Sequence, residues 1–317
     1  MRRPIVYLVL LVSLAGGIGW LKWNTIGAQP GSFLPPTLQQ AVAAIGDTSG
    51  LSKEQIASFD PKGFDVLGKP GPSDWLANHR EAGQTFPQYM RGQPNVPNQK
   101  RNKIYLQPLG EFDATKPGQS IDQIKDFANR YFQMEVIVLP PTEVDEKAIK
   151  SRTGGEGQTQ LLSTDVLQWC KGQLPDDAYC ILAITMVDLY PQESWNYVFG
   201  QASLRERVGV YSFSRYKAAD PALVLRRCCR VMGHETGHMF GIKHCVHFKC
   251  LMNGSNHLEE ADSQPLHLCP VCLRKLQAAI GFDITKRYEQ LRDFSKAADL
   301  NNESTWLANR LKTIQGN

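Results

Sequence analysis

Histidines and a glutamate between positions 234 and 244 have the types and spacing of a catalytic metal site. His234 and His238 are four residues apart, so on a helix both imidazoles project from one face and can bind a single ion. Gly241 allows a sharp turn after that helix, which lets His244 return as a third nitrogen ligand. Three neutral histidines leave the fourth position of a tetrahedral Zn²⁺ open to water. These residues therefore predict a catalytic zinc site.

Glu235 directly follows the first histidine of this set. On a helix its side chain lies about 100° around from that histidine, beside the ion rather than under it. A carboxylate in that place can take a proton from a zinc-activated water and pass it to the leaving amine. We therefore predict a zinc-dependent metallopeptidase that hydrolyses peptide bonds with Glu235 as the general base.

Four cysteines after His244 form a second set of metal-type ligands. They make two close pairs, C-x4-C and C-x2-C, separated by eighteen residues, a spacing typical of zinc sites. Four thiolates close the coordination sphere, so this second zinc is predicted to be structural. Because the first cysteine adjoins His244, we expect the cysteine zinc to hold the loop that delivers this histidine. The predicted ligands are Cys245, Cys250, Cys269 and Cys272.

Met252 lies two residues after Cys250 and has two interpretations: it packs beneath the catalytic zinc, or it is an ordinary core residue. The other four cysteines lack metal-ligand spacing. We expect them to be buried as small apolar residues, with a disulfide between the first two as the alternative. They are Cys170, Cys180, Cys228 and Cys229.

The segments around these motifs predict an α/β fold. Strand-like apolar runs at 103–110 and 134–141 bracket a helix-periodic segment at 120–133, which indicates a βαβ unit with parallel strands. The other expected elements are a helix at 161–170, one long buried strand at 179–190, a hairpin or edge strand at 197–213, a helix at 221–241, and C-terminal helices at 272–282 and 284–294.

The N-terminal part differs in amino-acid composition from the rest of the chain. Arg2 and Arg3 precede an uncharged stretch at 5–21, which fits either a cleaved signal peptide or a retained membrane anchor. We therefore expect an exported or membrane-anchored protein with N-terminal membrane contact, and an intracellular location is the alternative. The expected division is a signal peptide or anchor at 1–28, a linker and irregular wrapping segment at 29–102, a metallopeptidase domain at 103–300 and a C-terminal tail at 301–317.

Length and composition are those of a globular protein. A chain of 317 residues, 42% of them hydrophobic, is long enough to bury a sizeable core. The formal net charge of +4 is small and the basic residues form no long block, so no nucleic acid partner is predicted. The expected partner is a peptide or protein substrate.

The motif H-E-x-x-H-x-x-G-x-x-H followed by a methionine resembles the metzincin metallopeptidases. The continuation C-x4-C-x-M and C-P-x-C narrows the resemblance to the archaemetzincins, especially the eukaryotic-type members. It covers roughly residues 70–290, including "WLANHREAGQTFPQYM" and "NYVFGQASLRERVGVYS".

The resemblance implies a compact zincin fold with a mixed twisted sheet, an active-site helix and a zinc-stapled C-terminal helical part. It implies two Zn²⁺ ions and an edge strand at "YVFGQAS" that pairs with an extended peptide substrate. The roles it implies are catalytic zinc for His234, His238 and His244, general base for Glu235, Met-turn for Met252, and the second zinc for Cys245, Cys250, Cys269 and Cys272.

The chain departs from the family pattern in two places, and the resemblance implies nothing about those two features. The apolar N-terminal stretch is unusual beside the typically intracellular members. Asn253 and Gly254 follow the methionine where many other metzincins place a tyrosine, so no oxyanion stabiliser besides zinc is predicted. The remaining histidines of the region, His247, His257 and His267, are expected outside both metal sites.

Two other functions compete with the peptidase. One is a catalytically weak or inactive, zinc-stabilised module that binds peptides without turnover. The other is a redox system built from the cysteine pairs. The peptidase is favoured because a purely structural metal has no use for Glu235 beside an open ligand set.

Overall fold

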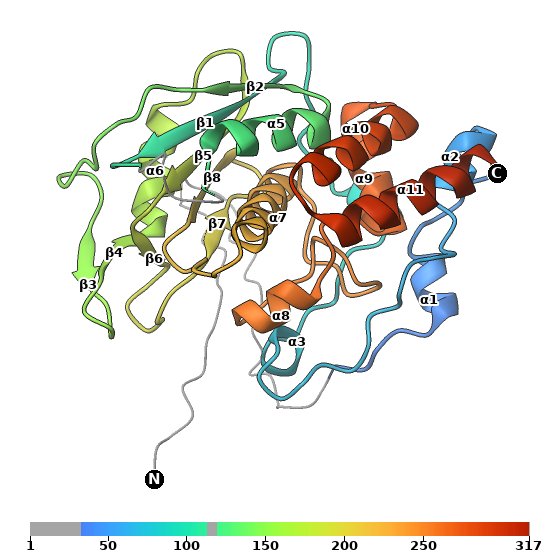
Figure 1. Cartoon of the computed structure of the whole chain (residues 1–317), viewed down its shortest axis with the longest axis horizontal. Helices are drawn as coiled ribbons and strands as arrows, with labels where there is room; N and C mark the ends of the chain where they lie inside the picture. Colours follow the sequence, from blue (N-terminus) through green and yellow to red (C-terminus); the bar gives the residue numbers. More distant parts are fainter. Residues whose placement is uncertain (1–32, 113–118, 317) are drawn as a thin grey trace.

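A five-stranded mixed sheet lies at the centre of the structure, a computed structural model that describes residues 33–112 and 119–316. Four neighbouring strands are parallel, and the last runs antiparallel at the sheet edge (Figure 1). This arrangement confirms the predicted mixed α/β fold. In spatial order the strands are β2 (Glu135–Val138), β1 (Lys103–Leu109), β5 (Ala178–Thr185), β8 (Val208–Ser212) and β7 (Gly200–Ala202).

The predicted βαβ unit is confirmed. Strands β1 and β2 pair in parallel from Lys103 opposite Glu135 onward, and α5 (Ile121–Phe132) connects them. The side chain of Ser120 caps α5 by accepting a hydrogen bond from the Gln123 amide. The buried residues of α5 recur at helical spacing, in agreement with the sequence periodicity; they are Ile124, Phe127, Ala128, Tyr131 and Phe132.

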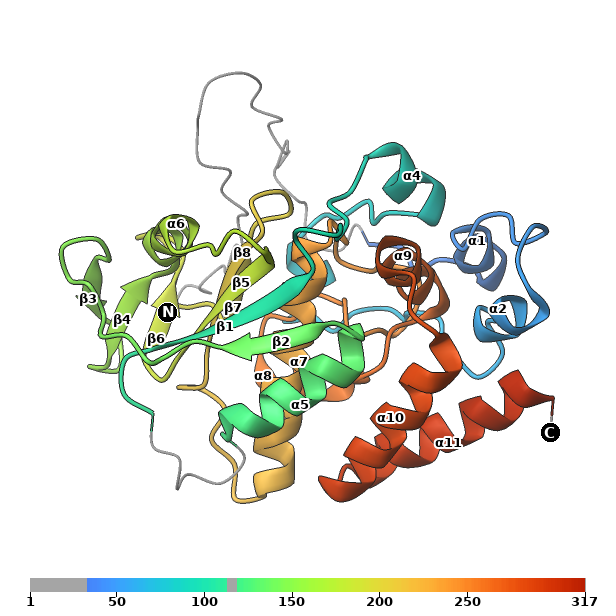
Figure 2. The same cartoon turned by 90° about the horizontal axis from the view of Figure 1, so that it is seen from above.

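Helices cover both faces of the sheet. Figure 2 shows α6 (Ser163–Gly172) on one face and α5 with α7 (Pro221–Met239) on the other. Alternate residues of β5 serve the two cores, as a strand requires. Leu182 packs on the side of α7, whereas Ile181 packs on the side of α6. Helix α7 therefore packs against the face of the sheet opposite to α6.

The prediction of one long strand at 179–190 is wrong. The chain bends after β5, where the hydroxyl of Thr185 accepts a hydrogen bond from the Val187 amide. It then enters β6 (Asp188–Tyr190), which belongs to a second sheet with β4 (Thr159–Leu162) and β3 (Ser151–Thr153). An uninterrupted apolar run cannot show that its two halves pair with different partners.

Short helices occur in the segment expected to be irregular, and the C-terminal part is helical. The two predicted C-terminal helices are confirmed as α9 (Pro270–Ile280) and α10 (Ile284–Ala297), and a further helix, α11 (Asn301–Gln315), occupies the segment expected to be a C-terminal tail. It packs on α10 and buries Leu307 and Leu311. The remaining elements are α1 (Leu38–Ala43), α2 (Lys53–Ser58), α3 (Trp75–Asn78), α4 (Phe86–Arg91) and α8 (Leu258–Ser263).

The predicted localisation has to be corrected. It relied on the apolar stretch at 5–21, which lies outside the described residues. Within the part of the chain that the structure describes, no helix is long and apolar enough to cross a bilayer, so the expected membrane anchor finds no support there.

Candidate metal centre

Helix α7 positions the first two predicted histidine ligands. It begins where the Asp220 carboxylate accepts a hydrogen bond from the Ala222 amide, with Pro221 in the first helical position. It ends at Met239, and Gly241 then adopts a positive φ of 76°, a conformation that favours glycine. The sharp turn predicted after the helix is therefore present.

The structure brings the three predicted histidines together. The Nε2 atoms of His234 and His238 lie 3.1 Å apart, and those of His234 and His244 lie 3.3 Å apart. A tetrahedral zinc with Zn–N distances of about 2.0–2.1 Å places its nitrogen ligands about 3.3 Å from one another. The observed spacing thus fits a zinc ion.

The other ring nitrogens determine which tautomer each histidine adopts. The Nδ1 atoms of His234 and His238 lie 2.9 and 2.7 Å from the carbonyl oxygens of Leu251 and Ile242. Carbonyl oxygens only accept, so each Nδ1 carries the hydrogen and each Nε2 carries a lone pair. Burial lowers the pKa of both rings, that of His238 to about 3, which keeps them neutral. Lone pairs at this separation repel unless a cation lies between them.

His244 obtains the same orientation from a carboxylate. Its Nδ1 donates to Oε1 of Glu81 over 2.7 Å, and both side chains are largely buried. The two residues are 163 positions apart, and the sequence analysis did not single out Glu81. No local spacing could have found it; only its place within the family-like segment "WLANHREAGQ" was a signal.

Glu235 lies buried beside this histidine cluster, against the edge strand β7. A Cβ atom built on Gly200 would lie only 2.7 Å from Oε1 of Glu235, so the strand backbone passes directly over the carboxyl group. Burial raises the pKa of Glu235 to about 8, and the charge of the nearby Arg230 opposes that shift. A carboxylate with a raised pKa is a stronger proton acceptor.

The four predicted cysteine ligands also converge. Their sulfur atoms all lie within 4.8 Å of one another, and those of Cys245 and Cys269 are 3.6 Å apart. A tetrahedral zinc with Zn–S distances of about 2.3 Å separates its sulfur ligands by about 3.8 Å. The Cys269 amide donates to the sulfur of Cys250, as expected for a thiolate acceptor. This cluster fits a second metal ion.

The remaining four cysteines are free and fully buried, as expected of small apolar residues. The alternative disulfide is not formed. They are Cys170, Cys180, Cys228 and Cys229.

Met252 packs directly against the turn of α7 between the two histidines. A Cβ atom built on Gly237 would lie 2.6 Å from the sulfur of Met252, which is fully buried. The methionine is therefore a core residue and also lies against the ligand-bearing turn, so the two interpretations drawn from the sequence are compatible.

The side chain of Asn253 forms hydrogen bonds across the loop that joins the histidine cluster to the cysteine cluster. Its amide nitrogen donates to the carbonyl oxygens of Cys245 and Phe248, and its amide oxygen accepts from the Cys250 amide, at 2.6–3.0 Å. The residue that follows Met252 is therefore a buried amide that organises the cysteine loop.

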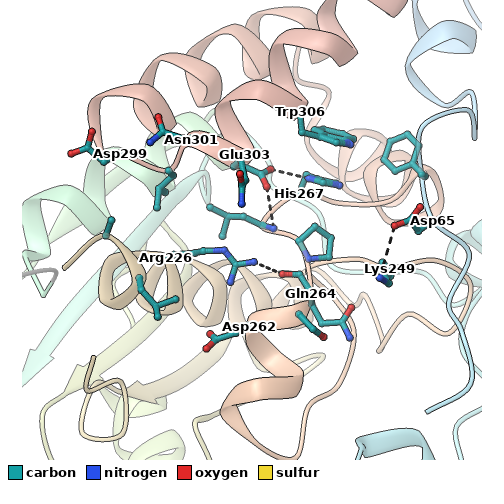
Figure 3. A pocket seen from close by; sticks show the side chains of 18 of the residues that line it. Asp65, Arg226, Lys249, Asp262, Gln264, His267, Asp299, Asn301, Glu303 and Trp306 are labelled. Atoms are coloured by element: carbon teal, nitrogen blue, oxygen red, sulfur yellow. Dashed lines mark hydrogen bonds and ion pairs between the residues drawn. The ribbon is translucent and has the colours of Figure 1, made fainter. Parts of the chain in front are cut away.

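Two of the other histidines lie with acidic partners away from both clusters. His257 contacts Asp74 and His267 contacts Glu303. The second pair lines a surface hollow of about 840 Å³ (Figure 3), and none of the predicted metal ligands lines this hollow.

Comparisons with known proteins show which sequences the chain is similar to. The profile of peptidase family M54 matches residues 123–278. Archaemetzincin-2 of Macaca fascicularis and that of Homo sapiens are each 38% identical over 281 residues, which cover 77% of this chain and 78% of the relative. Archaemetzincin-1 of Homo sapiens is 31% identical over 320 residues, 85% of this chain and 64% of the relative.

Solved structures of archaeal relatives are also similar to part of the chain. The archaemetzincin of Archaeoglobus fulgidus, crystallised as a complex with malonate, is 32% identical and covers 55% of this chain and 99% of its own, with a TM-score of 0.45. That of Methanopyrus kandleri is 31% identical and covers 58% of this chain and 98% of its own, with a TM-score of 0.47. By its similarity to the archaemetzincins over most of its length, the chain belongs to this family of zinc metallopeptidases, peptidase family M54.

Proposed function

We propose that His234, His238 and His244 hold the catalytic zinc of this peptidase and that Glu235 is its general base. The observation that carries the proposal is the convergence of three Nε2 lone pairs, each fixed by a hydrogen bond at Nδ1, beside a buried carboxyl group. Bound there, zinc would supply Lewis-acid polarisation of the scissile carbonyl and would lower the pKa of water. Glu235 would accept a proton from the attacking water and return it to the leaving amine.

The edge strand β7 is the proposed guide for the substrate backbone. An extended peptide can add to a sheet edge by main-chain hydrogen bonds. Gly200 of this strand lies over the carboxyl group of Glu235, so a peptide paired along β7 passes close to the general base. The substrate expected from this arrangement is an extended stretch of polypeptide.

We further propose that the four cysteines bind a second, structural zinc, which gives two zinc ions per chain. The spacing of the sulfur atoms supports this proposal. The cysteines are fully buried, and four thiolates leave no coordination position for a substrate. Two zinc equivalents that persist under mild oxidation would also exclude the cysteine redox system.

The decisive test is Glu235→Gln, measured by zinc analysis together with cleavage of a diverse peptide library. The variant is expected to keep both zinc equivalents and to lose hydrolysis by about 10²–10⁴-fold, the usual contribution of a general acid or base. Glu303→Gln, which removes a carboxylate from the hollow of Figure 3, is the matched control and should cleave normally. Normal cleavage by Glu235→Gln would exclude the proposed base.

A further inference from the structure

The N-terminal segment makes a continuous set of contacts with the loop that carries His244. We call residues 65–89 the brace and residues 240–249 the ligand loop. The contacts occur along the whole length of the loop rather than at one point. They are Tyr89 Oη to the Phe240 carbonyl, Gln84 Nε2 to the Gly241 carbonyl, the Lys243 amide to Gln84 Oε1, the Leu67 amide to the His247 carbonyl, and the Lys249 amide to the Asp65 carbonyl, at 2.8–3.2 Å.

The brace and the ligand loop also fit closely in shape. Gly83 has a positive φ of 67°, and a Cβ atom there would lie 2.3 Å from Cγ2 of Val246. Any side chain at this position would push the brace off the loop. The contact therefore requires glycine for both its backbone conformation and its lack of a side chain.

Glu81 lies in the middle of the brace and is held there by Trp75. Its Oε1 accepts from Nε1 of Trp75 over 2.9 Å as well as from Nδ1 of His244. The indole meets the His244 ring edge-on at 5.2 Å, and its own backbone amide donates to Glu260. On its other side the indole packs against Gly254, where a Cβ atom would lie 2.6 Å from Cδ1. The carboxylate is thus held by the protein through Trp75 as well as through His244.

We propose that Glu81 is a positioning residue for His244, so that the brace completes the histidine metal site. This inference rests on the zinc ligand set proposed above. His234 and His238 are held by a rigid helix and by nearby carbonyl groups, whereas His244 is on a loop and is oriented from a distant segment. A carboxylate at Nδ1 fixes the ring rotation and makes Nε2 a more basic ligand. Without Glu81, the loop histidine keeps neither property.

The chain offers a matched control pair. Glu303 Oε1 accepts from Nδ1 of His267 over 2.9 Å, and Figure 3 shows this contact in the hollow beside Trp306. The two glutamate–histidine pairs are alike in geometry, and all four side chains are between 11% and 16% exposed. Only the pair with Glu81 includes a predicted metal ligand.

The test is titration of the full metal-free chain with Co²⁺, which occupies tetrahedral zinc sites. Thiolate-to-cobalt charge transfer reports the cysteine site. Both tetrahedral sites have visible ligand-field bands, so the bands of the histidine site are taken as the difference from a His244→Ala variant titrated in parallel. Glu81→Gln removes the negative charge of this partner and should weaken cobalt binding at the histidine site by about 10–100-fold, the usual effect of mutating such a residue. Binding at the cysteine site should stay unchanged. Glu303→Gln should leave both sites as in the wild type.

The inference is overturned if Glu81→Gln binds cobalt at the histidine site within twofold of the wild type. If this variant also loses the cysteine signal, it has misfolded, and Trp75→Phe then takes its place because that change removes the hydrogen bond that holds Glu81 and leaves the carboxylate itself in the chain. Trp75→Phe should weaken the histidine site severalfold, and an unchanged affinity would again refute the inference. A wild type without any histidine-site signal would instead refute the ligand set itself.

Discussion

Gly200 on the edge strand β7 lies in contact with the carboxyl group of Glu235 on α7. A Cβ atom at Gly200 would approach Oε1, Cγ and Cδ of Glu235 to within 2.7–2.9 Å, which real side chains do not tolerate. The strand proposed to guide the substrate and the proposed general base are therefore packed as one unit, without room for a methyl group between them.

Gly200→Ala is expected to displace the Glu235 carboxylate. A shift of about 1 Å in a catalytic group can cost on the order of 10²-fold in rate, so kcat should fall by about that factor while both metal sites keep their affinity. Gly172→Ala is the control, because a Cβ there meets nothing within 4 Å. Steady-state cleavage kinetics and cobalt titration of both variants measure the effect. Full activity of Gly200→Ala would show that Glu235 has room to move without loss of function.

Shortening Met252 should affect both stability and the histidine metal site. Met252→Ala leaves a cavity under α7 and should lower the free energy of unfolding by about 2–5 kcal/mol, whereas Met252→Leu should cost less than about 1.5 kcal/mol. Because Met252 contacts the turn at Gly237, we also expect weaker metal binding by the alanine variant. Urea unfolding and cobalt titration test these points. A stability loss without a change in affinity would reduce Met252 to a packing residue.

The two metal sites should be coupled through the loop that joins them. The Cys245 amide donates to the Met252 carbonyl over 2.8 Å, and His244 precedes Cys245 directly. Cys250→Ala and Cys272→Ala are therefore expected to lose one zinc equivalent and also to bind zinc more weakly at the histidines. Cys170→Ala, equally buried but outside the cluster, is the control and should keep both zinc equivalents. An unchanged affinity at the histidine site in the first two variants would refute the coupling.

A buried ion pair in the second sheet should make stability dependent on pH. Asp188 is 3% exposed and accepts hydrogen bonds from Arg215 at 2.6 and 2.9 Å. Burial by itself raises the pKa of Asp188, but the hydrogen bonds from Arg215 and Gln160 outweigh it and hold the pKa below its usual value. A carboxyl group whose pKa is lower in the folded protein stabilises it above the unfolded-state pKa, and this stability is lost as the pH falls through the folded-state pKa.

Asp188→Asn should accordingly cost about 3 kcal/mol at neutral pH, at the lower end for a buried pair because Arg215 is partly exposed. The difference from the wild type should begin to shrink below about pH 4, near the unfolded-state pKa of an aspartate. It should disappear only below the lower folded-state pKa, where the wild-type carboxyl group is protonated as well. Glu206→Gln, which breaks a more exposed pair with Lys171, should cost less than about 1 kcal/mol. Urea unfolding across this pH range checks both variants, and a constant difference would argue against the ion pair as the cause.

The residues that converge on each metal cluster could be predicted from local sequence. His234 and His238 meet because four residues make about one helical turn, and paired cysteine spacings reflect how short loops supply metal ligands. The βαβ unit of β1, α5 and β2 was also predictable from local sequence. Apolar residues recur about every two residues in a strand and every 3.6 residues in a helix, and both patterns can be seen within one segment.

The tertiary structure alone determined the contacts between residues that are far apart in the chain. The sequence around residues 186 and 187 does not indicate that the chain passes from one sheet into another. The pairing of a strand depends on which other strands lie next to it in the fold. Likewise, nothing near Glu81 or Gly200 shows that one contacts His244 and the other Glu235. Local periodicity is set by backbone geometry within a few residues, whereas these contacts arise only when the brace, the edge strand and α7 pack around one core.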